Sequence, residues 1–125
     1  MNNKLAYTIL IAENDNTSFM YYKEVLSNLG YEIIWAQNGQ KAVNLFKERN
    51  DINLVIMDIE MPILNGYQAT SAIKEISPDT PILILTAYAM KSVKETAEKL
   101  HCDAFLTKPI RPKDLINAVL MHTKQ

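Results

Sequence analysis

The stretch Asn53–Gly66, NLVIMDIEMPILNG, places one carboxylate at the end of an apolar run. Residues 54–57 lead directly into Asp58, and Pro62 and Gly66 follow it. A buried strand seldom carries an acid at its tip, because burial of a charge is unfavourable. Asp58 therefore either forms a turn, where Asp is common, or takes part in chemistry.

Five short apolar runs, several of them rich in Ile and Val and bounded by turn residues, have the composition of β-strands. They are residues 7–12, 31–36, 54–57, 81–86 and 103–107. The first, third and fourth are apolar throughout rather than alternating, which indicates strands that are covered on both faces.

Segments with helical spacing of apolar residues separate or follow these runs. The spaced residues are Phe19, Tyr22, Leu26 and Leu29; Ala42, Leu45 and Phe46; Ala69, Ile73 and Ile76; Val93, Ala97 and Leu100; and Leu115, Ala118 and Val119. Gly30 marks the end of the first helix and Pro112 the start of the last. Strand and helix alternate five times, which predicts an α/β fold with a parallel sheet and helices on both sides.

The composition is that of a globular protein with room for one domain. The chain has 125 residues, of which 48% are hydrophobic and 22% are charged. A net charge of −1 without runs of like charge argues against direct binding of nucleic acid. The sequence contains no apolar stretch of ~18 residues and no signal peptide, and its single cysteine cannot form an internal disulfide. We expect one cytoplasmic domain over residues 1–125, with a core from about residue 7 to 122.

Four of the five strand ends carry a polar group suited to phosphate or metal chemistry. These groups are Glu13-Asn14-Asp15 after the first strand, Asp58 after the third, Thr86 after the fourth and Lys108 after the fifth. In open parallel sheets, ligands bind beyond the carboxyl ends of the strands. We therefore expect these side chains to converge at one edge of the sheet.

The residue types indicate phosphoryl chemistry at that edge. Asp58 can act as a nucleophile toward phosphorus and form an acyl phosphate. Oxygen ligands after the first strand suit Mg²⁺, which neutralises charge on a transferring phosphoryl group. Lys108 and the Thr86 hydroxyl can each donate to a phosphate oxygen.

These motifs resemble the response-regulator receiver domain of two-component signalling. The resemblance rests on the acids after the first strand, on MDIEMPILNG, on Thr86 in ILT-A and on Lys108-Pro109, and it covers Ile9 to about His122. It implies a flavodoxin-like (βα)5 fold, doubly wound, with a parallel five-stranded sheet in the order 2-1-3-4-5. It also implies that the peptide bond between Lys108 and Pro109 is cis.

The resemblance assigns a role to each polar strand end. Asp58 would be the phosphoacceptor, Thr86 the switch hydroxyl and Lys108 the phosphate-binding lysine. Mg²⁺ would be held by Glu13, Asn14, Asp58 and the backbone carbonyl of Glu60. Phe105 would be the aromatic switch residue, and Glu60 and Tyr88 would tune hydrolysis of the acyl phosphate. Our hypothesis for Tyr88 is that it shields Asp58 from water.

One position departs from the family pattern. Asn14 stands where a directly ligating Asp is expected, so the site loses one negative charge and Mg²⁺ affinity should fall. Glu13 would compensate, directly or through water. An alternative register would make Asp15 the ligand, although Asp15 would then lie past the strand tip.

The implied function is a phosphoacceptor domain of a phosphorelay, which assists its own phosphorylation and dephosphorylation but is not a turnover enzyme. The donor would be a phosphohistidine on a histidine kinase or a histidine phosphotransfer domain. The switch would repack the face of the fourth helix, fifth strand and fifth helix, which would also serve a weak dimer if the chain is not a monomer. Candidate contacts there are Met90, Val93, Lys94 and Ala97. The chain would be either a stand-alone receiver or part of a hybrid sensor kinase.

Two other functions are open on the sequence. A pseudo-receiver, which binds partners without phosphorylation, is favoured by Asn14, whereas the intact Asp58, Thr86 and Lys108 argue against it. A small phosphatase or flavodoxin-like enzyme would use Asp58 on soluble substrates, with Glu60 as a second acid. However, no insertion is long enough for a lid, and residues 12–18 carry acids where a flavin site needs a phosphate-cradling loop.

Overall fold

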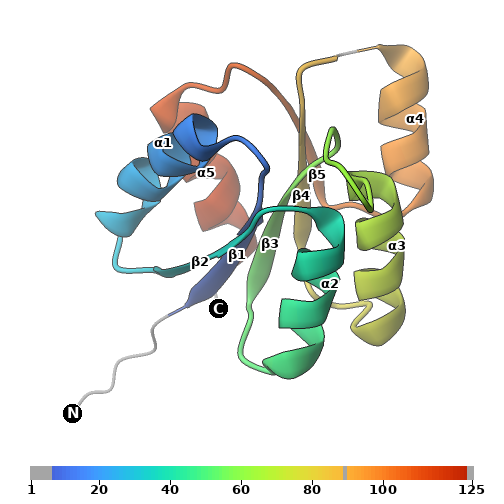
Figure 1. Cartoon of the computed structure of the whole chain (residues 1–125). Coiled ribbons are helices and arrows are strands. Elements are labelled where there is room, and N and C mark those ends of the chain that lie inside the picture. The colour runs from blue at the N-terminus through green and yellow to red at the C-terminus, as the bar shows by residue number, and fades with distance from the viewer. Residues whose placement is uncertain (1–6, 89, 124–125) are drawn as a thin grey trace.

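The computed structural model describes residues 7–88 and 90–123, within which five strands alternate with five helices (Figure 1). The strands are β1 (Thr8–Ala12), β2 (Glu32–Ala36), β3 (Leu54–Asp58), β4 (Ile82–Thr86) and β5 (Ala104–Thr107). The helices are α1 (Asn16–Ser27), α2 (Gly39–Glu48), α3 (Gly66–Ile76), α4 (Lys91–Lys99) and α5 (Pro112–Thr123). Every strand lies within one residue of its predicted bounds. None of these helices is long and apolar enough to cross a membrane.

The sheet is parallel, with the strand order β2-β1-β3-β4-β5, which confirms the flavodoxin-like arrangement. The register aligns Ala12 with Met57 and Asp58 with Leu85. β1 and β3 therefore end side by side, at the point where the strand order reverses. This is the place where open α/β sheets bind their ligands.

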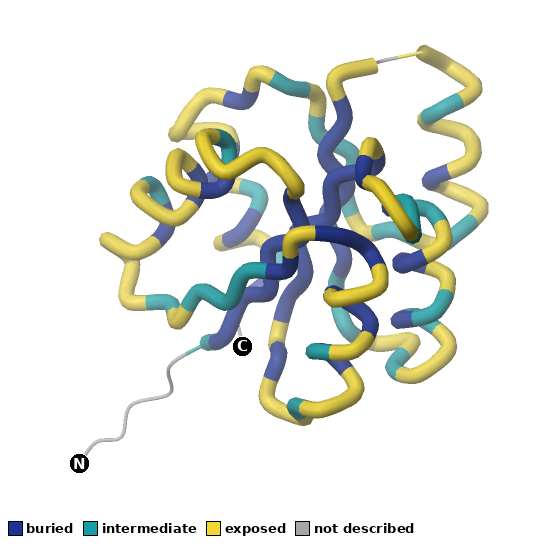
Figure 2. Tube along the Cα trace, viewed as in Figure 1, coloured by how far each residue is buried: buried dark blue, intermediate teal, exposed yellow. Residues whose placement is uncertain are grey.

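The sheet separates two apolar clusters. Helices α1 and α5 cover one face, and α2, α3 and α4 cover the other (Figure 1). The central strands β1, β3 and β4 are buried at every residue, as their unbroken apolar runs predicted, whereas the edge strands β2 and β5 are partly exposed (Figure 2). The central strands thus form the rigid base from which the polar strand ends project.

Side-chain caps fix where the helices next to the site begin. The Asp15 carboxylate accepts a hydrogen bond from the Ser18 backbone N–H at 2.9 Å and thereby starts α1. Asn65 and Gln68 form a reciprocal capping box at the start of α3. Such caps typically stabilise a helix by about 1 kcal/mol, and here they also fix the loops after β1 and β3.

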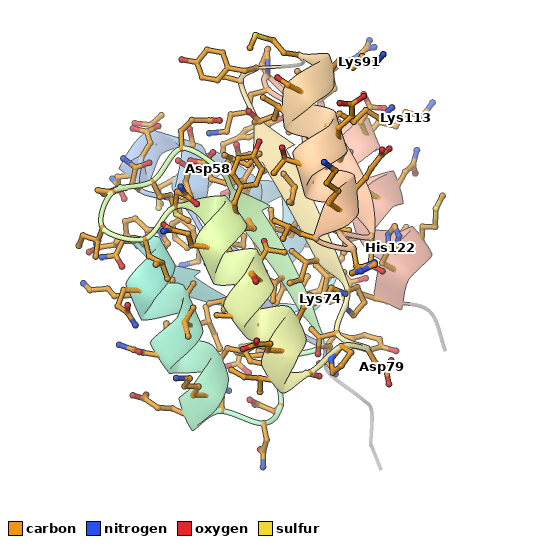
Figure 3. All side chains as sticks on the ribbon, turned by 90° about the vertical axis from the view of Figure 1, so that its right-hand side faces the viewer. Asp58, Lys74, Asp79, Lys91, Lys113 and His122 are labelled. Carbon is orange, nitrogen blue, oxygen red and sulfur yellow. The ribbon has the colours of Figure 1, made fainter. Side chains whose placement is uncertain are left out.

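Lys74 lies at the end of the sheet opposite to Asp58 (Figure 3). Its Nζ donates to the Asp103 carboxylate at 3.0 Å and to the carbonyls of Pro78 and Thr80. This cluster ties the loop after α3 to the start of β5. At this end of the sheet the polar groups bind one another and connect loops, whereas at the Asp58 end lie the polar groups that were predicted to take part in chemistry.

Two residues predicted on buried helix faces are exposed. Leu29 lies beyond the end of α1 at Ser27 and is 39% exposed, because the chain turns there toward Gly30, which has a φ of 86°. Ile76 is the last residue of α3 and is 47% exposed, since the buried face of that helix ends at Ile73. The helical spacing was right in both cases, but the helices end too early for these residues to reach the core.

Gly66 is where α3 approaches the backbone of Asp58. A Cβ at this position would overlap the Asp58 carbonyl oxygen and lie 2.6 Å from Ile59 Cα. We expect Gly66→Ala to lower the free energy of unfolding by about 1–3 kcal/mol, measured by urea denaturation, because backbone must move to admit the methyl group. Ser71→Ala on the exposed side of the same helix is the control and should change it by less than about 0.5 kcal/mol. Equal effects of the two substitutions would show that the close approach does not constrain the fold.

Candidate phosphoryl site

Three predicted site residues meet where β1 and β3 end. Asp58, the last residue of β3 (labelled in Figure 3), and Glu13, the first residue after β1, are each 1% exposed. Lys108 follows β5, and its Nζ lies 3.1 Å from Glu13 Oε1 and 3.3 Å from Asp58 Oδ1. Residues far apart in the sequence thus place two buried carboxylates around one ammonium group.

The charges at this point do not balance. Burial, and next the charge of Glu13, raise the pKa of Asp58 from 3.8 to about 7, while Lys108 opposes the change. Burial by itself would lower the pKa of Lys108, but Asp58 and Glu13 raise it. Two carboxylates facing one lysine carry an excess negative charge when both are ionised, which favours binding of a cation.

The oxygen atoms available to bind a cation include both charged carboxylates and neutral oxygens. Across residues 7–88 and 90–123, no group of three or more His, Cys, Asp or Glu side chains is placed to hold a metal ion. Glu13 and Asp58 supply two carboxylates, and neutral oxygens of the Asn14 amide and the Glu60 backbone carbonyl are the remaining candidates. Oxygen donors with excess negative charge fit Mg²⁺, which usually takes one or two protein carboxylates and keeps water ligands.

Asn14 and Asp15 are both exposed. Of these two side chains, that of Asp15 is held by hydrogen bonds, both of them to Ser18. Its carboxylate accepts from the Ser18 hydroxyl at 2.7 Å and from the Ser18 N–H, and these two bonds lower its pKa. Asp15 therefore serves as the cap of α1. In this position the Asp15 carboxylate is already used in two hydrogen bonds to Ser18, whereas whether Asp15 or Asn14 ligates a metal stays a prediction.

Trp35 on β2 fixes the backbone of Glu13, a contact that sequence reasoning missed. The indole Nε1 donates to the Glu13 carbonyl at 2.7 Å. The ring stacks on Phe19 of α1 with centroids 4.4 Å apart. A half-buried indole needs an acceptor for its N–H, but the sequence could not indicate which carbonyl would supply it.

Thr86 lies at the predicted edge but hydrogen-bonds to Glu60. The Thr86 hydroxyl donates to Glu60 Oε2 at 2.7 Å and accepts from the Tyr88 N–H at 3.0 Å. Glu60 Oε1 also accepts from the Ala87 N–H at 3.4 Å. The resemblance implied a metal-ligating carbonyl and a tuning role for Glu60, but not this use of its carboxylate.

The remaining predicted positions are mostly where the sequence placed them. Phe105 is half-buried and packs against the apolar cluster under α2, α3 and α4, and the peptide bond between Lys108 and Pro109 is cis. Met90 is 58% exposed, as a contact residue must be. Ala97, predicted as a contact residue, is fully buried, because it lies one turn after Val93 on the helix face that packs on the sheet.

Comparison with known proteins places these features in one family. Residues 9–120 match the family described as the response regulator receiver domain. Hybrid signal transduction histidine kinase I of Dictyostelium discoideum is 35% identical over 119 residues, which cover 89% of this chain and 7% of that protein. The autoinducer 1 sensor kinase/phosphatase LuxN of Vibrio campbellii is 36% identical over 107 residues, which cover 86% of this chain and 12% of LuxN. This chain thus corresponds to a small part of each of these relatives.

A solved structure of similar sequence shows the same fold with a metal ion. The receiver domain of sensor histidine kinase PA1611 from Pseudomonas aeruginosa superposes with a TM-score of 0.86 at 25% identity, over 94% of this chain and 98% of that chain. That structure has a magnesium ion coordinated in its active site cleft.

The buried charge of Asp58 gives a testable dependence of stability on pH. Its pKa is about 7 in the folded chain against 3.8 ordinarily, so between these values the folded chain binds more protons than the unfolded chain. The free energy of unfolding therefore falls as pH rises through this range. In EDTA, we expect Asp58→Asn to raise the free energy of unfolding by about 1–3 kcal/mol near pH 8, with the gain shrinking toward about pH 4.

The control is Asp51→Asn, which removes an exposed carboxylate whose pKa is lowered by its hydrogen bond to Arg49. It should not stabilise the chain at either pH. If Asp58→Asn raised the free energy of unfolding equally at both pH values, the gain would not come from the ionised form of Asp58. That result would contradict a raised pKa for this buried carboxyl.

Proposed function

This chain belongs to the response-regulator receiver family of two-component signalling, and on that premise we propose that Asp58 accepts a phosphoryl group from a phosphohistidine. The donor is a histidine kinase or a histidine phosphotransfer domain in the cytoplasm. The observation that carries the proposal is the buried Asp58 carboxylate, held 3.3 Å from the Lys108 ammonium at the switch point of the sheet.

The transfer makes one bond and breaks one. A carboxylate oxygen of Asp58 attacks phosphorus, the new O–P bond forms as the P–N bond breaks, and the electron pair of that bond returns to the imidazole nitrogen. Asp58 must be ionised to attack, and the neighbouring Lys108 charge favours that form. Lys108 remains beside the product and compensates the charge of the phosphoryl oxygens.

Glu13, Asn14, Asp58 and the Glu60 carbonyl would hold Mg²⁺. When bound, the ion supplies positive charge that offsets the two carboxylates and the phosphoryl oxygens. Asn14 contributes a neutral oxygen in place of a carboxylate, so we expect the site to bind Mg²⁺ more weakly than one with Asp at this position.

Phosphorylation biases a two-state switch. The new charge on Asp58 draws Thr86 and Lys108 inward, and the space left by Thr86 lets Phe105 turn. The face of α4, β5 and α5 is thereby repacked for its partner or for a weak dimer. This domain is a signalling module that assists its own phosphorylation and dephosphorylation, alone or within a hybrid kinase.

Phosphorylation of Asp58 can be measured directly. We expect intact-protein mass spectrometry after incubation with acetyl phosphate and Mg²⁺ to show one phosphoryl adduct on the wild-type chain. EDTA and Asp58→Ala should each abolish it, because the metal charge or the nucleophile is then missing. Asn14→Asp should produce the same adduct at a lower Mg²⁺ concentration.

An absent adduct at every Mg²⁺ concentration would contradict the proposal and favour the pseudo-receiver. Recovery of the adduct only in Asn14→Asp would identify the neutral amide as the cause. An adduct that persists in Asp58→Ala would show that another residue accepts the phosphoryl group.

Tyr88 is the proposed shield of the acyl phosphate. Its side chain is 57% exposed, but its N–H is bonded to the Thr86 hydroxyl, so movement of Thr86 displaces the Tyr88 backbone as well. We expect Tyr88→Ala to speed the loss of the adduct by a factor of about two or more, because water reaches Asp58 more easily. The decay of the phosphoryl mass after removal of acetyl phosphate measures this, and an unchanged half-life would exclude shielding by Tyr88.

A further inference from the structure

The Glu60 side chain connects the two loops that border the site. Its backbone N–H lies 3.4 Å from Asp58 Oδ1, which fixes Glu60 beside the phosphoacceptor. Its carboxylate crosses to the loop after β4, where one oxygen binds the Thr86 hydroxyl and the other the Ala87 N–H. Glu60 is exposed while Thr86 is fully buried, so a solvent-facing carboxylate holds a buried donor.

The direction of the Thr86 hydrogen bonds can be assigned. A backbone N–H can only donate, so Thr86 Oγ1 is the acceptor of the Tyr88 N–H. A carboxylate can only accept, so the single hydroxyl hydrogen of Thr86 points to Glu60 Oε2. Thr86 consequently has no hydrogen left for any other acceptor while the Glu60 contact is formed.

The two donors held by Glu60 lie at the strand end next to Asp58. β4 pairs with β3 with Asp58 opposite Leu85, one residue before Thr86. A phosphoryl group on Asp58 would present several anionic oxygens toward this strand end. The Glu60 carboxylate, with two anionic oxygens, already occupies the hydroxyl and amide donors that would meet them.

We propose that Glu60 is an internal latch that occupies the phosphoryl-binding donors Thr86 and Ala87 in the resting chain. Resting on the proposed function of Asp58, this assigns Glu60 a specific action, which is to compete with the phosphoryl group for hydrogen bonds. Phosphorylation breaks the latch, and the released carboxylate turns into solvent. The contact therefore opposes phosphorylation and biases the switch toward its resting state.

The competing explanation is that Glu60 acts only through its negative charge. Glu60→Asp separates the two, because it keeps the charge but shortens the side chain by one methylene group and withdraws the carboxylate from Thr86. Glu60→Ala removes both charge and contact. Glu95→Gln, which neutralises an exposed glutamate on α4, is the matched control.

The experiment has two readouts. The first is the rate of adduct formation with acetyl phosphate, followed by intact mass over a range of Mg²⁺ concentrations up to saturation. The second is the amide proton shift of Ala87 in ¹H–¹⁵N NMR spectra of the unphosphorylated, metal-free chain, which requires no phosphorylation. The Mg²⁺ series separates an altered rate from altered metal affinity.

We expect Glu60→Asp and Glu60→Ala to be phosphorylated about three- to tenfold faster than the wild type, as expected for loss of the hydrogen bond to Thr86, the shorter of the two competing bonds. The Ala87 amide proton should move upfield in both variants, and Glu95→Gln should match the wild type in both readouts. A Glu60→Asp chain that keeps the wild-type rate while Glu60→Ala is faster would overturn the latch in favour of simple repulsion. An Ala87 proton that stays in place in Glu60→Asp, or one that moves without a change in rate, would also overturn it.

Failure of the proposed function gives a different result. If the wild type and every Glu60 variant gain no adduct, Asp58 is not a phosphoacceptor, and the latch has nothing to oppose. An adduct on the wild type with equal rates in all variants leaves the proposed function intact and removes the latch alone.

Discussion

The sharing of one ammonium group by two buried carboxylates is the interaction on which the site depends. Glu13 and Asp58 are brought together because the adjacent strands β1 and β3 end at the same level. Lys108 follows β5, which lies beyond β4 in the sheet, and its side chain reaches both carboxylates. Burial makes the repulsion between the two acids costly, so the resting site is poised to take up positive charge. The fold thus maintains a local imbalance that both metal binding and phosphorylation would change.

The stability of the rest of the molecule permits this imbalance. The three central strands are buried along their whole length, and the helices on both faces cover them with apolar side chains. At the opposite edge, Lys74 satisfies one carboxylate and two carbonyls. The excess negative charge thereby lies at one end of the sheet, beyond the buried strands.

The fold and the positions of the strand ends could be predicted from sequence because both follow from local patterns. Apolar runs identify the strands, and parallel pairing brings their carboxyl ends to one edge, so Asp58 and Lys108 were expected to be close. The Glu60 contact with Thr86 could not be predicted, because it depends on the path of two loops and on one rotamer. The apolar spacing of Val93 and Ala97 predicted the buried face of α4 correctly. Ala97 was also assigned as a contact residue, and its full burial shows that this second assignment was wrong.

The contact between Trp35 and the Glu13 carbonyl has an optical consequence. The chain contains a single tryptophan, and its indole is hydrogen-bonded to the backbone of a proposed metal-binding residue. Indole emission depends on the surroundings of the indole N–H, so the fluorescence of Trp35 should respond to a change at the Glu13 carbonyl. A shift of the Glu13 backbone on binding of a cation should therefore appear as a change in the intrinsic fluorescence of the chain.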